Sequence, residues 1–151
     1  MRLLIFAAAL TATASTAFAQ GPSDWRRAPL AGGSWAYREL PTGSEAVFTD
    51  ARVTRRVLVK CSRATRRVTI SVVSPTAASS IRVSTTEAER VLPASFDAQG
   101  FQITADLGAQ DPILDAIAFS RGRVAFTIAG GSALVVPAWP EIARSIEDCR
   151  I

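Results

Sequence analysis

The sequence predicts a mainly β fold, in which seven to eight antiparallel strands form a sandwich or an open barrel and two short helices lie near the C-terminus. The first observation behind this prediction is the alternation of apolar and polar residues over short segments, which is typical of half-buried strands. The second is the presence of turn-forming residues between those segments. The third is that helix-start signals, Pro112 and Pro140, occur only in the last forty residues.

The first half of the chain contains four expected strands. Residues 34–39 and 46–49 flank a turn that contains Pro41 and Gly43. The two clearest strands are residues 53–60 and 67–74, because their apolar residues share one face and their arginines and threonines share the other. We expect the connection between them to be a turn that contains Cys61.

The second half of the chain continues the alternation and adds the helices. Its expected strands cover residues 79–85, 101–107, 123–129 and 132–136, with Phe101 pointing inward at the start of the second. Residues 89–92 are a further candidate to pair with 79–85. Asp111 is a suitable N-cap for a helix that Gly122 is placed to end. A last helix begins at Pro140 and places Trp139, Ile142, Ile146 and Cys149 on one side.

The N-terminus has the pattern of a secretory signal peptide over residues 1–19. Arg2 supplies a positive start, and a short apolar run leads to an A-x-A cleavage site that ends at Ala19. Cleavage is therefore expected between Ala19 and Gln20. The apolar run is shorter than the roughly 20 residues that cross a membrane, so we expect a periplasmic or secreted protein with no transmembrane segment after cleavage.

Three segments follow from this interpretation. Residues 1–19 are the signal peptide, residues 20–33 are a flexible leader rich in Pro, Gly and Arg, and residues 34–151 form a single β-rich domain. The size of the segment 34–151 is within the usual range of about 100–200 residues per domain.

The chain has two cysteines, Cys61 and Cys149. In an exported protein the simplest interpretation is one disulfide bond; two buried free thiols are the alternative. The bond would join the last helix to the middle of the sheet. It would also bring Glu147 and Asp148 close to Lys60 and Arg63, which would neutralise part of the positive charge there.

A basic segment is the main candidate for a site. No acidic residue occurs between Asp50 and Glu87, whereas eight basic residues do. The candidate anion- or partner-binding residues among them are Arg52, Arg55, Arg56, Arg63, Arg67 and Arg82. Outward arginines on neighbouring strands would form a positive face for phosphate or carboxylate groups. The alternative is that they are solvated strand faces that discourage edge pairing.

Several classes of function are disfavoured by composition. The chain has no histidine, which is the usual general base and transition-metal ligand. No S-x-x-K, G-x-S-x-G or calcium-loop spacing is present. We therefore expect no enzyme activity, metal or cofactor. Nucleic acid is disfavoured because the net charge is only +4 and no aromatic residues interleave with the arginines.

The order of several segments resembles a group of known proteins. Trp35 lies in an early strand, L-V-K-C ends a later strand at Cys61, and a final helix ends in Cys149. This order resembles small uncharacterised exported bacterial proteins and is distantly similar to periplasmic accessory proteins of type VI secretion systems. The resemblance implies an exported β-rich domain that acts by binding.

Together these observations predict a non-catalytic binding or accessory protein of the cell envelope, with an envelope protein or an anionic envelope polymer as its partner. Two alternatives are open: an envelope hydrolase that uses a serine or carboxylate not located by the sequence, and a structural subunit of an envelope complex. The three tryptophans, Trp25, Trp35 and Trp139, either line a ligand groove or pack in the core.

Overall fold

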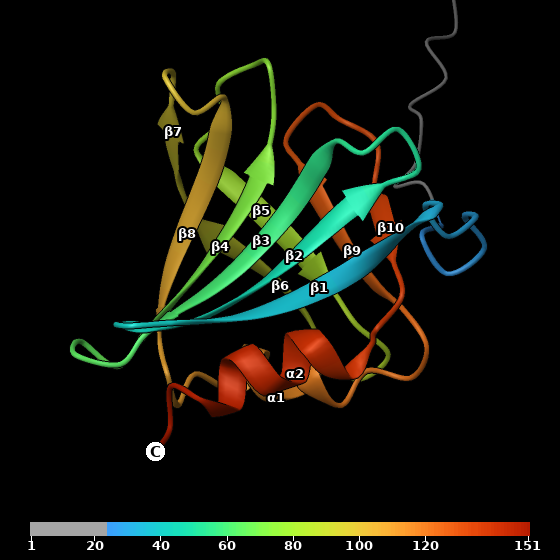
Figure 1. Ribbon diagram of the computed structural model, residues 1–151. Helices are drawn as coiled ribbons and strands as arrows, with labels where there is room; N and C mark the ends of the chain where they lie inside the picture. The colour runs from blue at the N-terminus through green and yellow to red at the C-terminus, as the bar shows by residue number, and fades with distance from the viewer. Residues whose placement is uncertain (1–23) are drawn as a thin grey trace, which may run out of the picture.

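The computed structural model describes residues 24–151, which form two antiparallel sheets and two short helices (Figure 1). The sheets are not closed into a barrel, so the predicted mainly β sandwich is confirmed. The predicted signal peptide and its cleavage point at Ala19 lie outside the described residues.

The larger sheet has six strands in the order β1-β2-β3-β4-β8-β7. Their bounds are β1 Gly33–Leu40, β2 Gly43–Asp50, β3 Arg55–Ser62, β4 Arg67–Val73, β7 Ser95–Asp97 and β8 Gln102–Gly108. The smaller sheet has four strands in the order β10-β9-β5-β6. Their bounds are β5 Ser80–Ser84, β6 Glu89–Pro93, β9 Val124–Ile128 and β10 Leu134–Val136. Residues 24–151 thus contain ten strands, more than the seven to eight expected: the candidate segment 89–92 forms β6, and β7 lies outside every segment expected to be a strand.

The inner faces of the two sheets share one core. In β3, Val57, Val59 and Cys61 are fully buried, while the residues between them face outward. Ile81 and Val83 of β5 are buried against them from the other sheet. The period-2 alternation of the sequence therefore produces the sandwich directly, because each strand has one apolar face to bury.

The helices close one end of the sandwich (Figure 1). Helix α1, Pro112–Ala118, begins as predicted, with the Asp111 carboxylate accepting a hydrogen bond from the Ile113 N–H at 3.0 Å. Helix α2, Pro140–Glu147, packs on β1, β2 and β3. Its fully buried Ser145 donates a hydrogen bond from Oγ to the carbonyl oxygen of Val59 at 3.1 Å. This bond fixes α2 to the centre of the larger sheet.

The sandwich thus has two unlike ends. We call the end with α1 and α2 the helix end; the turns β1–β2, β3–β4 and β5–β6 also lie there. We call the opposite end the loop end, and it is formed by the connections 51–54, 74–79, 98–101 and 129–133 (Figure 1).

Four details differ from the sequence-based expectations. Cys61 lies inside β3 and not in a turn, because the strand continues to Ser62. Phe101 is 59% exposed, because its φ of 48° places it in the turn before β8. Helix α1 ends at Ala118, before Gly122. Trp139 precedes α2 as its N-cap and is exposed rather than packed with the apolar side of the helix.

The disulfide bond predicted between Cys61 and Cys149 is present, with a Cα–Cα distance of 5.4 Å. Both residues are fully buried. Cys149 follows α2 directly, so the bond ties the end of the chain to β3 across 88 residues of sequence. In the chain-entropy model a loop of this length stabilises the fold by roughly 4–5 kcal/mol.

The described part of the leader lies on the smaller sheet. Trp25 is buried against Ala125 and Val135 on the outer face of that sheet. The N–H of Ala31 donates to the carbonyl oxygen of Val135 at 2.7 Å, at the edge of β10. With Trp35 also buried in the main core, two of the three tryptophans serve packing.

Replacing Cys149 by Ser should lower the free energy of unfolding by roughly 4–5 kcal/mol, because the unfolded chain regains the entropy of an open loop. Urea unfolding of the variant and of the oxidised wild type measures this difference. The matched control is Ser145→Ala, which removes the neighbouring hydrogen bond, keeps the disulfide and should cost about 1 kcal/mol. Equal losses of unfolding free energy in the two variants would contradict the stabilising role assigned to the disulfide.

Candidate anion-binding site

The six candidate arginines do not form one face. The loop end carries Arg52, Arg55 and Arg56, the helix end carries Arg63 and Arg67, and β5 of the smaller sheet carries Arg82. The first two groups are separated by the length of β3, roughly 20–25 Å for a strand of this length. The fold therefore does not form a continuous positive face over the 52–67 hairpin.

Four of the six arginines form ion pairs within the molecule. The pairs are Arg56 with Asp50 at 3.1 Å, Arg63 with Glu39 at 3.3 Å, Arg67 with Asp106 at 2.8 Å and Arg82 with Glu89 at 2.6 Å. Such exposed pairs add little stability, but each one reduces the local positive charge. The positive charge of the acid-free segment is thus partly neutralised by acids that lie outside it in the sequence.

One hollow on the outer face of the larger sheet collects side chains from three neighbouring strands. It has a volume of about 370 Å³ and is lined by Lys60, Ser62, Thr65, Arg67, Thr69 and Asp106. In the strand register, Lys60 of β3 lies beside Thr69 of β4, which lies beside Asp106 of β8. The volume is within the range of about 300–1,000 Å³ found for small-ligand sites. We call this surface the Lys60 hollow.

The charges in the Lys60 hollow leave one cation unbalanced. Arg67 donates from Nε to Asp106 at 2.9 Å, and this hydrogen bond raises the pKa of Arg67. Glu45, the neighbour of Lys60 in the register of β2, is held by Arg38. Within the described part of the chain no acidic group forms an ion pair with Lys60. The ammonium group of Lys60 is therefore free to bind an anion.

The groups around Lys60 are mainly hydrogen-bond donors. The ammonium offers three N–H donors, and Ser62, Thr65 and Thr69 each offer a hydroxyl that donates or accepts. Asp106 supplies an acceptor, but it is already bonded to Arg67. This arrangement suits a ligand that carries a carboxylate or phosphate together with hydroxyl groups.

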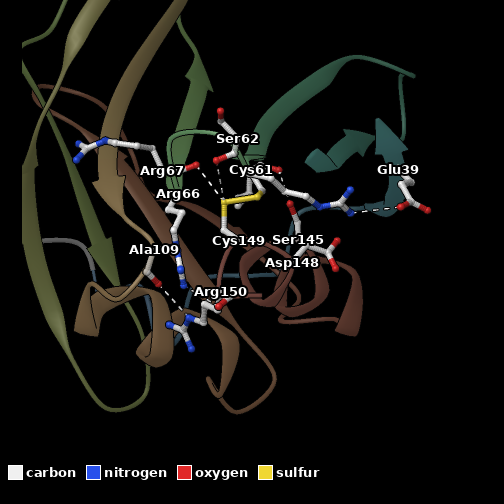
Figure 2. The surroundings of a disulfide bond; sticks show 12 residues. Glu39, Cys61, Ser62, Arg66, Arg67, Ala109, Ser145, Asp148, Cys149 and Arg150 are labelled. Carbon is white, nitrogen blue, oxygen red and sulfur yellow. Dashed lines mark hydrogen bonds and ion pairs between the residues drawn. A yellow bond between two sulfur atoms is a disulfide. The ribbon is translucent and has the colours of Figure 1, made fainter. Parts of the chain in front are cut away.

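The disulfide lies directly beneath the Lys60 hollow. Cys61 points inward between the outward-facing Lys60 and Ser62. The Cys149 sulfur lies 3.2 Å from the carbonyl oxygen of Arg67 and 3.6 Å from that of Ser62, as Figure 2 shows. The backbone positions that carry the hollow are therefore held in place by the covalent link.

The C-terminal residues add a network beside the disulfide (Figure 2). Arg66 donates to the carbonyl oxygen of Arg150 at 2.8 Å, and Arg150 donates to that of Ala109 at 3.0 Å. Arg150 also pairs with Asp115 at 2.7 Å and with Glu147 at 3.1 Å. The expectation that Glu147 lies against Lys60 is therefore wrong: Glu147 turns to the arginine three residues later.

Asp148, which follows α2, is a further carboxylate of this network. It accepts a hydrogen bond from the Tyr37 hydroxyl at 2.6 Å. Burial raises the pKa of Asp148, but the Tyr37 hydrogen bond and the charges of Arg63 and Arg144 outweigh burial, so its pKa lies below the usual value. The expected approach of Asp148 to Arg63 is thus confirmed. The same hydrogen bond raises the pKa of Tyr37, and the pair serves to hold α2 against β1.

A second hollow, of about 220 Å³, lies on the outer face of the smaller sheet and includes Arg82, Val91 and Thr127. Its arginine is bonded to Glu89, whose pKa is lowered by hydrogen bonds from Ser84 and Arg82. The hollow therefore offers no free charge. Among residues 24–151, no three acidic, cysteine or histidine side chains gather as metal ligands would.

Sequence reasoning missed the hydroxyl and carboxylate residues of the Lys60 hollow. Thr69 and Asp106 are 37 positions apart, and only the pairing of β4 with β8 makes them neighbours. A signal was present, since both occupy outward positions of well-predicted alternating strands. The pairing itself has no local signature.

Comparison with protein-family models, with curated proteins and with solved structures finds no match. The resemblance to type VI secretion accessory proteins thus remains a prediction. No helix among the described residues is long and apolar enough to cross a membrane.

Replacing Tyr37 by Phe should raise the pKa of Asp148 toward its usual value of about 3.9, because the carboxylate loses a hydrogen bond that favours its charged form. A carboxyl group with a lowered pKa contributes stability above its unfolded pKa, and this contribution is lost as the pH falls through the folded pKa. The variant should therefore lose about 1–2 kcal/mol at pH 7 and clearly less at pH 2. Urea unfolding at both pH values checks this, and an equal loss at both would contradict it.

Proposed function

We propose that this protein is an exported, non-catalytic binding protein of the cell envelope, and that the Lys60 hollow binds an acidic polysaccharide. The observation that carries the proposal is the free ammonium of Lys60 among three hydroxyl-bearing residues on an exposed sheet face. A carboxylate on a sugar ring would pair with Lys60, and the sugar hydroxyls would bond to Thr65, Thr69 and Asp106. The predicted signal peptide and the disulfide, which is compatible with an oxidising compartment, support an envelope location.

Binding fits the Lys60 hollow better than hydrolysis does. Its one lining carboxylate, Asp106, is already engaged in an ion pair with Arg67 at 2.8 Å. Two carboxyl groups across a cleft, which glycoside hydrolysis requires, are not present in this hollow. A nucleophilic serine would need a base, and none of the other lining residues of this hollow is hydrogen-bonded to the Ser62 hydroxyl.

The flat setting of the hollow favours a polymer over a small molecule. Thr69 lies in the middle of the sheet and Thr65 lies in the β3–β4 turn, so the lining residues run from the sheet face to its end. A chain of sugars can follow that path and place successive residues on different donors. Affinity would then come from several weak contacts in series.

Replacing Lys60 by Met should lower the affinity for polygalacturonate, a polymer of carboxylated sugars, at least about tenfold, because the free cation is removed while the length of the side chain is kept. Adding Thr69→Val should lower the affinity further. Retention on immobilised polygalacturonate at increasing salt measures this, with neutral dextran as the reference polymer.

The matched control is Arg55→Met, which removes one positive charge at the loop end and should leave retention within about twofold. Two results would contradict the proposal: no retention of the wild type at low salt, or equal losses for Lys60→Met and Arg55→Met. Specific co-purification of an acidic protein in place of the polymer would favour the accessory-subunit alternative.

A further inference from the structure

The loop end carries two exposed apolar side chains in unfavourable backbone conformations. Val53 is 85% exposed and has a φ of 62°; Phe101 is 59% exposed and has a φ of 48°. Positive φ is uncommon for residues other than glycine and is a true outlier for a β-branched residue. Each residue therefore costs free energy in its conformation, and its exposed side chain recovers little of that cost by packing.

The geometry of the two turns explains the positive φ values, but it does not explain why valine and phenylalanine occupy these positions. In the β2–β3 turn, the Val53 N–H donates to the carbonyl oxygen of Asp50, and the Asp50 N–H donates to that of Thr54, both at 2.9 Å. A three-residue hairpin loop of this kind normally has glycine at the left-handed position. Phe101 occupies the corresponding last position of the β7–β8 turn. Asparagine or glycine would satisfy both turns with less strain.

A third hairpin has a positive-φ residue whose side chain forms a hydrogen bond within the molecule. Arg66 also has a positive φ, of 51°, at the last position of the β3–β4 turn. Its guanidinium donates to the carbonyl oxygen of Arg150, so the unfavourable backbone is matched by an interaction within the molecule (Figure 2). Val53 and Phe101 are exposed instead, so packing within the molecule does little to offset their unfavourable backbone conformations.

The loop end carries more positive than negative charge. Of the two acidic residues beside its turns, Asp50 accepts from the N–H groups of Arg52 and Thr54 and pairs with Arg56, whereas Asp97 accepts from the N–H of Gln99 and is exposed. The Thr54 hydrogen bond, with Arg56, holds the pKa of Asp50 below its usual value. Connections 74–79, 98–101 and 129–133 contain no charged residue. Among the described residues Arg52 and Arg55 form no ion pair.

We propose that the loop end docks on an anionic lipid surface, with Val53 and Phe101 entering the headgroup region and Arg52 and Arg55 contacting lipid phosphates. The two apolar tips belong to turns on either side of β4, so they lie roughly 15–20 Å apart along one end of the sheet. Exposed apolar tips accompanied by two unpaired arginines, which outnumber the one exposed carboxylate at Asp97, match the composition of peripheral membrane surfaces. The small uncharged loops between them allow close approach.

Vesicle co-sedimentation tests this, using the exported chain and vesicles of phosphatidylethanolamine with or without one quarter phosphatidylglycerol. Every variant carries the same N-terminal residues, so differences between variants report on the loop end alone. The first variant is Val53→Asn with Phe101→Asn, and the second is Arg52→Gln with Arg55→Gln. Each should lower the partition coefficient on anionic vesicles at least about tenfold, and Phe101→Trp alone should retain binding.

The matched control is Phe119→Asn with Arg121→Gln, which makes the same chemical change to an exposed Phe and Arg near the helix end. It should bind vesicles within about twofold of the wild type, as should Lys60→Met, which tests the polysaccharide site separately. Because asparagine tolerates a positive φ, the urea midpoint of the first variant should be equal to or above that of the wild type.

Three results of the vesicle experiment would overturn the inference. They are a wild type that does not sediment with anionic vesicles at low salt, loop-end variants that bind as the wild type does, and a control variant that loses as much affinity as they do. A wild type that is retained by an acidic protein surface but not by vesicles would assign the loop end to a protein partner and would also overturn it.

Discussion

The covalent link between Cys61 and Cys149 is the constraint on which the rest of the arrangement depends. Without it, α2 would be held to the larger sheet only by apolar contacts and by a few hydrogen bonds such as that from Ser145 to Val59. With it, one end of the sandwich is closed by helices and the backbone beneath the Lys60 hollow is fixed.

Local sequence patterns predicted much of the fold because strand alternation is a local property. Residues 67–73 show buried and outward positions close to the pattern read from the letters alone. The same alternation was wrong for Phe101. It predicted an inward side chain, but the positive φ of Phe101 in the turn before β8 directs the side chain outward. Cys61 was placed in a turn because the end of a strand has no sharp sequence signal when polar residues follow it.

The candidate site was harder to predict because charge balance in a sheet is decided by pairing. The stretch between Asp50 and Glu87 is acid-free in sequence, yet Arg67 meets Asp106 across β4 and β8. Conversely, Lys60 is a single basic residue among many in the sequence, and it stands out only after the pairs around it are removed. Strand register therefore decides which basic residue has no acidic partner. The hydrophobic pattern constrains this register but does not specify it.

The placement of Trp25 limits how far the chain can be shortened from its amino-terminal side. The ring covers Ala125 and Val135, and six residues later Ala31 occupies the open hydrogen-bonding edge of β10. A protease that trimmed the chain past this point would leave an apolar patch and a bare strand edge side by side, the combination that promotes intermolecular pairing. Cleavage of the chain beyond Trp25 would therefore create an aggregation-prone product.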